Sequence, residues 1–121
     1  MIDHVTANVG DFEQAKSFYG QVLAPLGYSV QMEFNGSAGL GSGEGMPDFW
    51  ISSREGRGAT HVAFTAKDRA SVDAFYEAAM AAGATDNGAP GLRPHYHEHF
   101  YAAFVHDADG NNIEAVCHLP E

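Results

Sequence analysis

A stretch near the start of the chain is repeated 57 positions further along. Residues 4–19, "HVTANVGDFEQAKSFY", align with residues 61–76, "HVAFTAKDRASVDAFY", with five identities in register, among them His4 with His61. Each copy reads as a β-rich strand, then an Asp at a helix N-cap position, then apolar residues at helical spacing. Such a duplication constrains the fold strongly, because each copy is expected to form the same unit.

Short strand-like runs separated by turn signals follow each predicted helix, and the helices are expected to end near Pro25 and Gly83. Each copy is therefore predicted to be a βαβββ module, which places the chain in the α+β class. The runs are 28–34, 38–41 and 47–53 in the first copy, and 101–107 and 111–118 in the second, with a poorly formed strand within 85–93.

The 121 residues are long enough for one domain with a real core. We expect a single domain over 1–121, with a first module at 1–53, a linker at 54–58 and a second module at 59–121. A four-stranded sheet cannot cover both of its faces alone, so the modules must pair with each other or with those of a second chain. A homodimer is therefore expected.

Composition excludes several classes of protein. Six Lys and Arg against sixteen Asp and Glu give a net charge of −10, which argues against binding to nucleic acid. No apolar run approaches the ~20 residues that a membrane span needs, and the first residues lack the pattern of a signal peptide. A cytoplasmic protein is expected. Cys117 is the only cysteine, which excludes an internal disulfide.

Three residues are candidate metal ligands. Equivalent first strands would bring His4 and His61 to face each other about a pseudo-twofold axis, and Glu114 lies in an apolar strand where a carboxylate needs a partner. Two histidines and one carboxylate form a common site for a divalent metal with open positions. The alternative is two structural histidines and a glutamate that faces water at the sheet edge.

Several motifs together resemble the vicinal oxygen chelate superfamily, which includes glyoxalases, bleomycin resistance proteins and extradiol dioxygenases. They are "IDHV" at the start, "FY" in both helices, "THVAF" opening the second copy, and "DADGNNIEAV" near the end. The resemblance implies a half-open curled β-barrel with its helices outside. It also implies one divalent metal ion on His4, His61 and Glu114, with Fe, Mn, Ni and Zn not distinguished.

The resemblance departs from glyoxalase I at one position. That enzyme takes a further carboxylate from the last strand of the first module, and Trp50 stands there in this chain. Asp48 would restore a carboxylate only if the register were shifted.

Two functions would use a small-molecule cleft, and a third possibility, a protein–protein interaction module on this fold, would make no use of the three candidate ligands. The first is a metal-dependent enzyme in which the ion acts as a Lewis acid on a small substrate chelated through adjacent oxygens. Its reaction is either that of a glyoxalase-like lyase or isomerase, or that of an extradiol-type dioxygenase. The second is a non-catalytic protein that binds a cationic drug, as bleomycin resistance proteins do.

A nucleotide loop in the Gly-rich run 39–45 is rejected, because its spacing is wrong and a strand follows.

His95, His97 and His99 alternate, so on a strand they would share one face. If Ala103 lies opposite Glu114 in the last hairpin, His99 and Tyr101 face the cleft. His97, His99 and Tyr101 are therefore candidate catalytic residues, with a solvated loop as the alternative. The residues expected to line the pocket are Trp50, Phe49, Phe104 and Tyr101.

Overall fold

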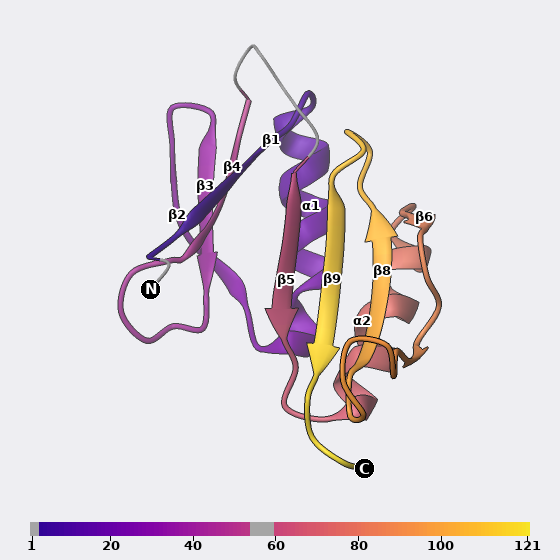
Figure 1. Cartoon of the computed structure of the whole chain (residues 1–121). Coiled ribbons are helices and arrows are strands. Elements are labelled where there is room, and N and C mark those ends of the chain that lie inside the picture. The colour runs from indigo at the N-terminus through magenta and orange to yellow at the C-terminus, as the bar shows by residue number, and fades with distance from the viewer. Residues whose placement is uncertain (1–2, 54–59) are drawn as a thin grey trace.

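The computed structural model describes residues 3–53 and 60–121 and has the predicted α+β class, with two helices and two mixed sheets (Figure 1). One sheet belongs to each half of the chain. Within the described residues the two sheets do not close into a barrel. The linker predicted at 54–58 lies outside the described residues.

The first sheet has the strand order β1-β4-β3-β2. Its first strand runs parallel to its last, and the other neighbours are antiparallel. The elements of this half are β1 (Val5–Asn8), α1 (Phe12–Val22), the 3-10 helix η1 (Ala24–Leu26), β2 (Ser29–Phe34), β3 (Ser37–Gly41) and β4 (Phe49–Ser52).

The second sheet repeats this pattern with the order β5-β9-β8-β6, and the short β7 also pairs with β8. Its first and last strands are again parallel. The elements of this half are β5 (His61–Thr65), α2 (Arg69–Ala81), β6 (Thr85–Asp86), β7 (Gly91–Leu92), β8 (Tyr101–His106) and β9 (Asn112–Cys117). In Figure 1 both helices lie behind β5, β9 and β8, so they cover one side of the molecule.

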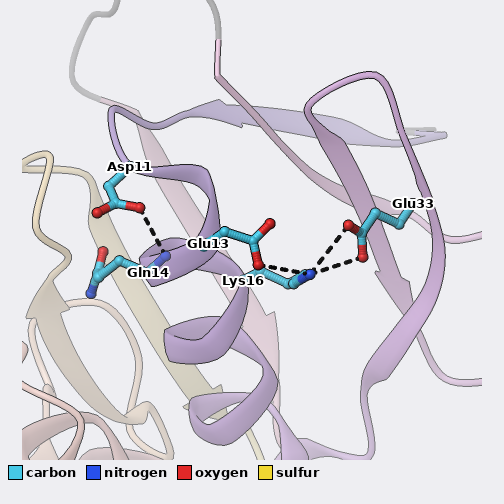
Figure 2. Close-up of polar contacts among 5 residues, drawn as sticks. All are labelled: Asp11, Glu13, Gln14, Lys16 and Glu33. Atoms are coloured by element: carbon cyan, nitrogen blue, oxygen red, sulfur yellow. Dashed lines mark hydrogen bonds and ion pairs between the residues drawn. The ribbon is translucent and has the colours of Figure 1, made fainter.

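Both helices begin as the repeat predicts. The Asp11 carboxylate accepts a hydrogen bond from the Gln14 backbone N–H at 3.0 Å (Figure 2), and Asp68 accepts one from Ser71 N–H at 2.8 Å. Each cap satisfies a backbone donor that has no partner within the helix. Hydrogen bonding to the Ser71 side chain, and then to the Ser71 backbone N–H, lowers the pKa of Asp68. The position of the Asp in each copy thus sets where the chain turns from strand to helix.

Lys16 ties α1 to the edge strand of the first sheet. Its ammonium lies 3.0 Å from a Glu33 carboxylate oxygen in β2 and 3.1 Å from Glu13 one turn back in the helix (Figure 2). The hydrogen bond to Glu33 is the main cause of the raised pKa of Lys16. Because the carboxylates are largely exposed, we assign this cluster a small share of stability.

The two halves share one apolar core. The Phe49 ring of β4 packs between Tyr19 of α1 and Phe64 of β5, with ring centroids 5.1 Å apart in both contacts. Truncating a buried aromatic residue of this kind costs about 3–5 kcal/mol. The contact across the halves therefore contributes strongly to holding β4 beside β5.

The acidic turn near the end of the chain joins the halves a second time. Asp107 accepts a hydrogen bond from the buried Tyr19 hydroxyl at 2.5 Å, and Asp109 accepts one from Gly10 N–H at 2.9 Å. Burial, and then the Asp107 charge, raise the pKa of Tyr19 far above its ordinary value. This turn is thus part of the joint between the modules.

In the described part of the chain, no helix is long and apolar enough to cross a membrane.

Candidate functional site

The first strand of each half turns every second side chain away from the core. In β5, His61, Ala63 and Thr65 are exposed, whereas Val62 and Phe64 are buried. We call the side of each sheet that carries the exposed residues its open face. This alternation follows from the two-residue period of a strand, and it places His61 on an open face.

His61 meets Glu114 on this open face. Parallel pairing sets Ala63 beside Glu114, and His61 Nε2 lies 3.0 Å from Glu114 Oε1. Glu114 is only 4% exposed, while the His61 ring is half exposed. A carboxylate this deeply buried is costly unless it has a partner, and the imidazole supplies one.

His4 lies in the same pocket as His61. The pocket measures about 310 Å³ and is lined by both first strands, β1 and β5. His4 Nδ1–H donates a hydrogen bond to the Asp3 carboxylate at 2.7 Å. Since a neutral imidazole carries one proton, this bond leaves Nε2 with the lone pair that a metal ion needs. We call this the histidine pocket.

Asp48 also lines the histidine pocket, just before β4. It accepts a hydrogen bond from the Tyr28 hydroxyl at 2.6 Å. Burial and this bond raise the pKa of Tyr28 well above its ordinary value. Tyr28 therefore stays a donor, and it holds the Asp48 carboxylate at the pocket wall.

The observed strand pairing puts Trp50 at the position that the sequence predicts for it. Thr6 pairs with Trp50 in the first sheet, and its repeat equivalent Ala63 pairs with Glu114 in the second. Trp50 thus takes the position that corresponds to Glu114. The register is the expected one, so Asp48 does not take that position.

The donor set fits a divalent metal ion in part. Two ligand atoms about 2.1 Å from an ion and at right angles to each other lie ~3.0 Å apart, which equals the separation of His61 Nε2 and Glu114 Oε1. The bond from His4 to Asp3 matches the carboxylate–histidine arrangement around metals. In residues 3–53 and 60–121, however, no three His, Cys, Asp or Glu side chains already form one metal-binding group. His4 would have to approach the pair.

A second pocket of about 430 Å³ lies on the open face of the first sheet. Its lining combines short polar side chains with two aromatic rings, and His4 lines it as well as the histidine pocket. We call it the first-sheet pocket. The lining residues are His4, Thr6, Asn8, Phe34, Ser37, Trp50 and Ser52.

The expected register of the last hairpin is wrong by one residue. Phe104, and not Ala103, pairs with Glu114, because residues 107–111 form the turn and His106 pairs with Asn112. Tyr101 consequently points to the opposite side of the sheet, where its hydroxyl donates to Asp73 of α2 at 2.7 Å. It does not line the histidine pocket.

Residues 94–99 form turns where the alternating histidines suggested a strand. The His97 ring stacks on His118 with centroids 4.8 Å apart, and its Nε2 lies 2.5 Å from His118 Nδ1. His97 Nδ1 accepts a hydrogen bond from His99 N–H at 3.1 Å. His97 therefore pairs with the end of β9, and neither His97 nor His99 lines the histidine pocket.

Phe104 and Phe49, two further residues expected to line the pocket, differ in how deeply they are buried. Phe104 is beside the metal candidates, with its ring centroid 6.5 Å from that of His61. Phe49 is 1% exposed and belongs to the core, although it closes the bottom of the histidine pocket. Sequence reasoning missed Asp3 and Tyr28, since a contact such as that of Tyr28 with Asp48 leaves no local sequence signal.

Two similar modules whose first strands line one pocket define a small duplicated α+β protein. The family model described as the Glyoxalase/Bleomycin resistance protein/Dioxygenase superfamily matches residues 1–115. The chain belongs to this superfamily.

Solved structures agree with this assignment. A glyoxalase/bleomycin resistance protein from Albidiferax ferrireducens has a TM-score of 0.84 and 29% identity, covering 95% of this chain and 97% of that one. A glyoxalase/bleomycin resistance protein/dioxygenase family enzyme from Burkholderia phytofirmans has a TM-score of 0.76 and 21% identity, covering 98% of both chains. No curated protein matches the chain.

Proposed function

We propose that the chain is a metal-dependent enzyme of the glyoxalase/dioxygenase type, with a divalent ion held by His4, His61 and Glu114. The observation that carries this proposal is the 3.0 Å contact of His61 with the buried Glu114. A buried carboxylate at ligand spacing from an imidazole, in a pocket that a second histidine also lines, supports a site for a divalent metal ion.

The ion would supply Lewis-acid polarisation of two adjacent oxygens on a small substrate. The side chains around it would orient that substrate, with the Phe104 ring opposite Glu114 as an apolar wall. Of the two described carboxylates that line the histidine pocket, Asp3 accepts a hydrogen bond from His4, whereas Asp48 accepts one from Tyr28. We assign Asp48 the transfer of a proton, which favours glyoxalase-like lyase or isomerase chemistry over ring-opening dioxygenation.

Metal analysis tests the proposal. Protein purified without chelator should hold about one divalent ion per chain, and His61→Ala should lose it. His118→Ala is the matched control, because His118 pairs with His97 away from the pocket. If wild-type protein supplied with Fe, Mn, Ni or Zn binds none of them stoichiometrically, the enzyme proposal is abandoned.

A second candidate is a non-catalytic protein that binds a cationic drug. It is favoured by Asp3 and Asp48, the two carboxylates of the histidine pocket. The described lining of this pocket contains no Lys or Arg. Calorimetric titration of metal-free protein with cationic antibiotics separates the candidates. Tight binding without metal, together with no metal uptake, would support the drug-binding function.

We also propose that the protein is a homodimer in the cytoplasm, as the sequence suggests. Support for a dimer comes from β2, which lies at the edge of the first sheet and carries the exposed Met32. Light scattering on purified protein tests this, and a monomer mass would contradict it.

A further inference from the structure

The first-sheet pocket is built around a flat aromatic surface. Trp50 pairs with Gly39 on the neighbouring strand, and a Cβ added to Gly39 would lie 2.9 Å from the Trp50 ring. Only a glycine at this position lets the indole lie close against the strand. The ring is thus held against the sheet while it still lines the pocket.

A second ring extends this surface. Phe34 packs edge-on against Trp50, with centroids 5.8 Å apart and planes at 71°. Phe34 lies on the edge strand β2 and is 53% exposed, so part of its side chain is open to a ligand. Two aromatic rings at this angle form a corner that fits a planar ring by stacking on one and meeting the edge of the other.

Among the described lining residues, the polar side chains are uncharged apart from His4. Thr6 and Asn8 of β1 supply a hydroxyl and an amide, and Ser37 donates a hydrogen bond to Ser52 at 3.1 Å. Within residues 3–53 and 60–121, the lining contains no Asp, Glu, Lys or Arg. A charged group placed there would lose water without gaining an ionic partner, whereas neutral polar groups would find hydrogen bonds.

We infer that the first-sheet pocket binds an uncharged, planar aromatic group that stacks on Trp50 and Phe34. His4 is shared with the histidine pocket, so a ring bound here lies next to the proposed metal site. The inference depends on the proposed function only in assigning this ring to the substrate. Trp50 and Phe34 are then the residues that select the ligand class.

Three probes with one ring system and different charge test the inference: 2-naphthylmethanol, 2-naphthoate and 2-naphthylmethylamine. Trp50 is the only tryptophan, so its single indole N–H signal in an NMR spectrum reports binding directly. The titrations use metal-free protein with chelator, above the ordinary titration range of histidine. We expect the neutral alcohol to shift this signal and to bind about tenfold more tightly than either charged probe.

Phe34→Ala should weaken binding of the alcohol about tenfold, because it removes one ring of the corner. Leu92→Ala is the matched control, since Leu92 is 48% exposed but lies on the second sheet. Its affinity should equal that of the wild type. The inference is overturned if the alcohol does not move the signal, if a charged probe binds as tightly, or if Phe34→Ala binds like the wild type.

The metal experiment remains independent of these titrations. Tight binding of the alcohol by a protein that takes up no metal would leave the aromatic pocket standing and remove only the enzyme proposal. If the protein binds metal stoichiometrically but does not discriminate among the probes, the enzyme proposal stands and the aromatic pocket is rejected.

Discussion

Trp50 occupies in the first sheet the position that Glu114 occupies in the second. The pairings of Thr6 with Trp50 and of Ala63 with Glu114 are equivalent under the repeat. The same strand position therefore carries an acidic group in one module and an aromatic ring in the other. Equivalent positions of the two modules therefore hold a candidate metal ligand in one case and an aromatic surface in the other.

Trp50→Glu should restore a carboxylate at this position. If His4, His61 and Glu114 hold an ion, the added oxygen ligand should tighten divalent metal binding about tenfold or more, as measured by calorimetry. The change also removes a half-buried ring and should lower the free energy of unfolding by ~1–2 kcal/mol. Trp50→Leu removes the ring without adding a ligand, so equal metal affinity in both variants would contradict the assignment.

Glu114→Gln should separate function from stability. The amide keeps an oxygen for His61 but removes a buried charge, so the metal-free variant should be within about 1 kcal/mol of wild type, or more stable. Metal affinity should fall at least tenfold, because the carboxylate ligand is lost. Thermal unfolding in chelator and metal titration measure the two effects.

Asp107→Asn is the contrasting variant, since Asp107 is, among the described residues, the buried acidic side chain besides Glu114. Its carboxylate accepts hydrogen bonds from Tyr19 and from the Asp109 and Asn111 backbone N–H groups. This variant should lose about 2–3 kcal/mol of stability with unchanged metal affinity. The opposite pattern in the two variants would assign Glu114 a structural role.

Tyr19→Phe should weaken the joint between the modules. The fully buried hydroxyl donates to Asp107, and its loss leaves that carboxylate one partner short, at a cost of about 1–3 kcal/mol in urea unfolding. Tyr76 is its repeat equivalent, but its bond to Asp86 lies at the surface. Tyr76→Phe should therefore cost ~0.5 kcal/mol or less, and similar losses in both variants would count against the joint.

The burial of Tyr19, and after it the charge of Asp107, set an alkaline limit on stability by raising the pKa of the Tyr19 hydroxyl. Because the folded pKa of Tyr19 is raised, its contribution is fully present below the ordinary tyrosine pKa of about 10 and is lost as pH rises above it. Tyr19→Phe should lose less stability than the wild type over that alkaline range.

Much of the fold could be predicted because aligning the two copies shows which residues occupy equivalent positions in their strands. The first strands align through His4 and His61, and a separate alignment of the last strands, "MPDFWI" with "GNNIEA", puts Trp50 at the position of Glu114. The pairings of Trp50 with Thr6 and of Glu114 with Ala63 confirm that placement. The predicted helix ends near Pro25 and Gly83 were likewise confirmed, since α1 ends at Val22 and α2 at Ala81.

The last hairpin could not be predicted, because its register depends on the length of its turn. The Asp107 side chain accepts hydrogen bonds from Asp109 and Asn111 N–H, and Gly110 has a φ of 82°. These features hold five residues, 107–111, in the turn, and one residue of difference moved Tyr101 from the cleft side to the side of α2.

Asp3 should act as a positioning residue for the proposed metal site. It accepts the hydrogen bond from His4 Nδ1–H, which directs the lone pair of Nε2 toward a ligand role. Asp3→Ala should therefore lower divalent metal affinity about tenfold in calorimetry. Asp3→Asn keeps an acceptor oxygen and should recover part of that loss. The free energy of unfolding should not change, since the Asp3 side chain is 95% exposed.

Glu98→Gln provides the control for a general loss of surface charge. Glu98 precedes His99 as Asp3 precedes His4, and its carboxylate lies 3.6 Å from the ring of that histidine. The pair lies outside the histidine pocket, so metal affinity should stay at the wild-type value. If Asp3→Ala and Glu98→Gln weaken metal binding equally, the effect comes from long-range charge, and His4 needs no orienting carboxylate.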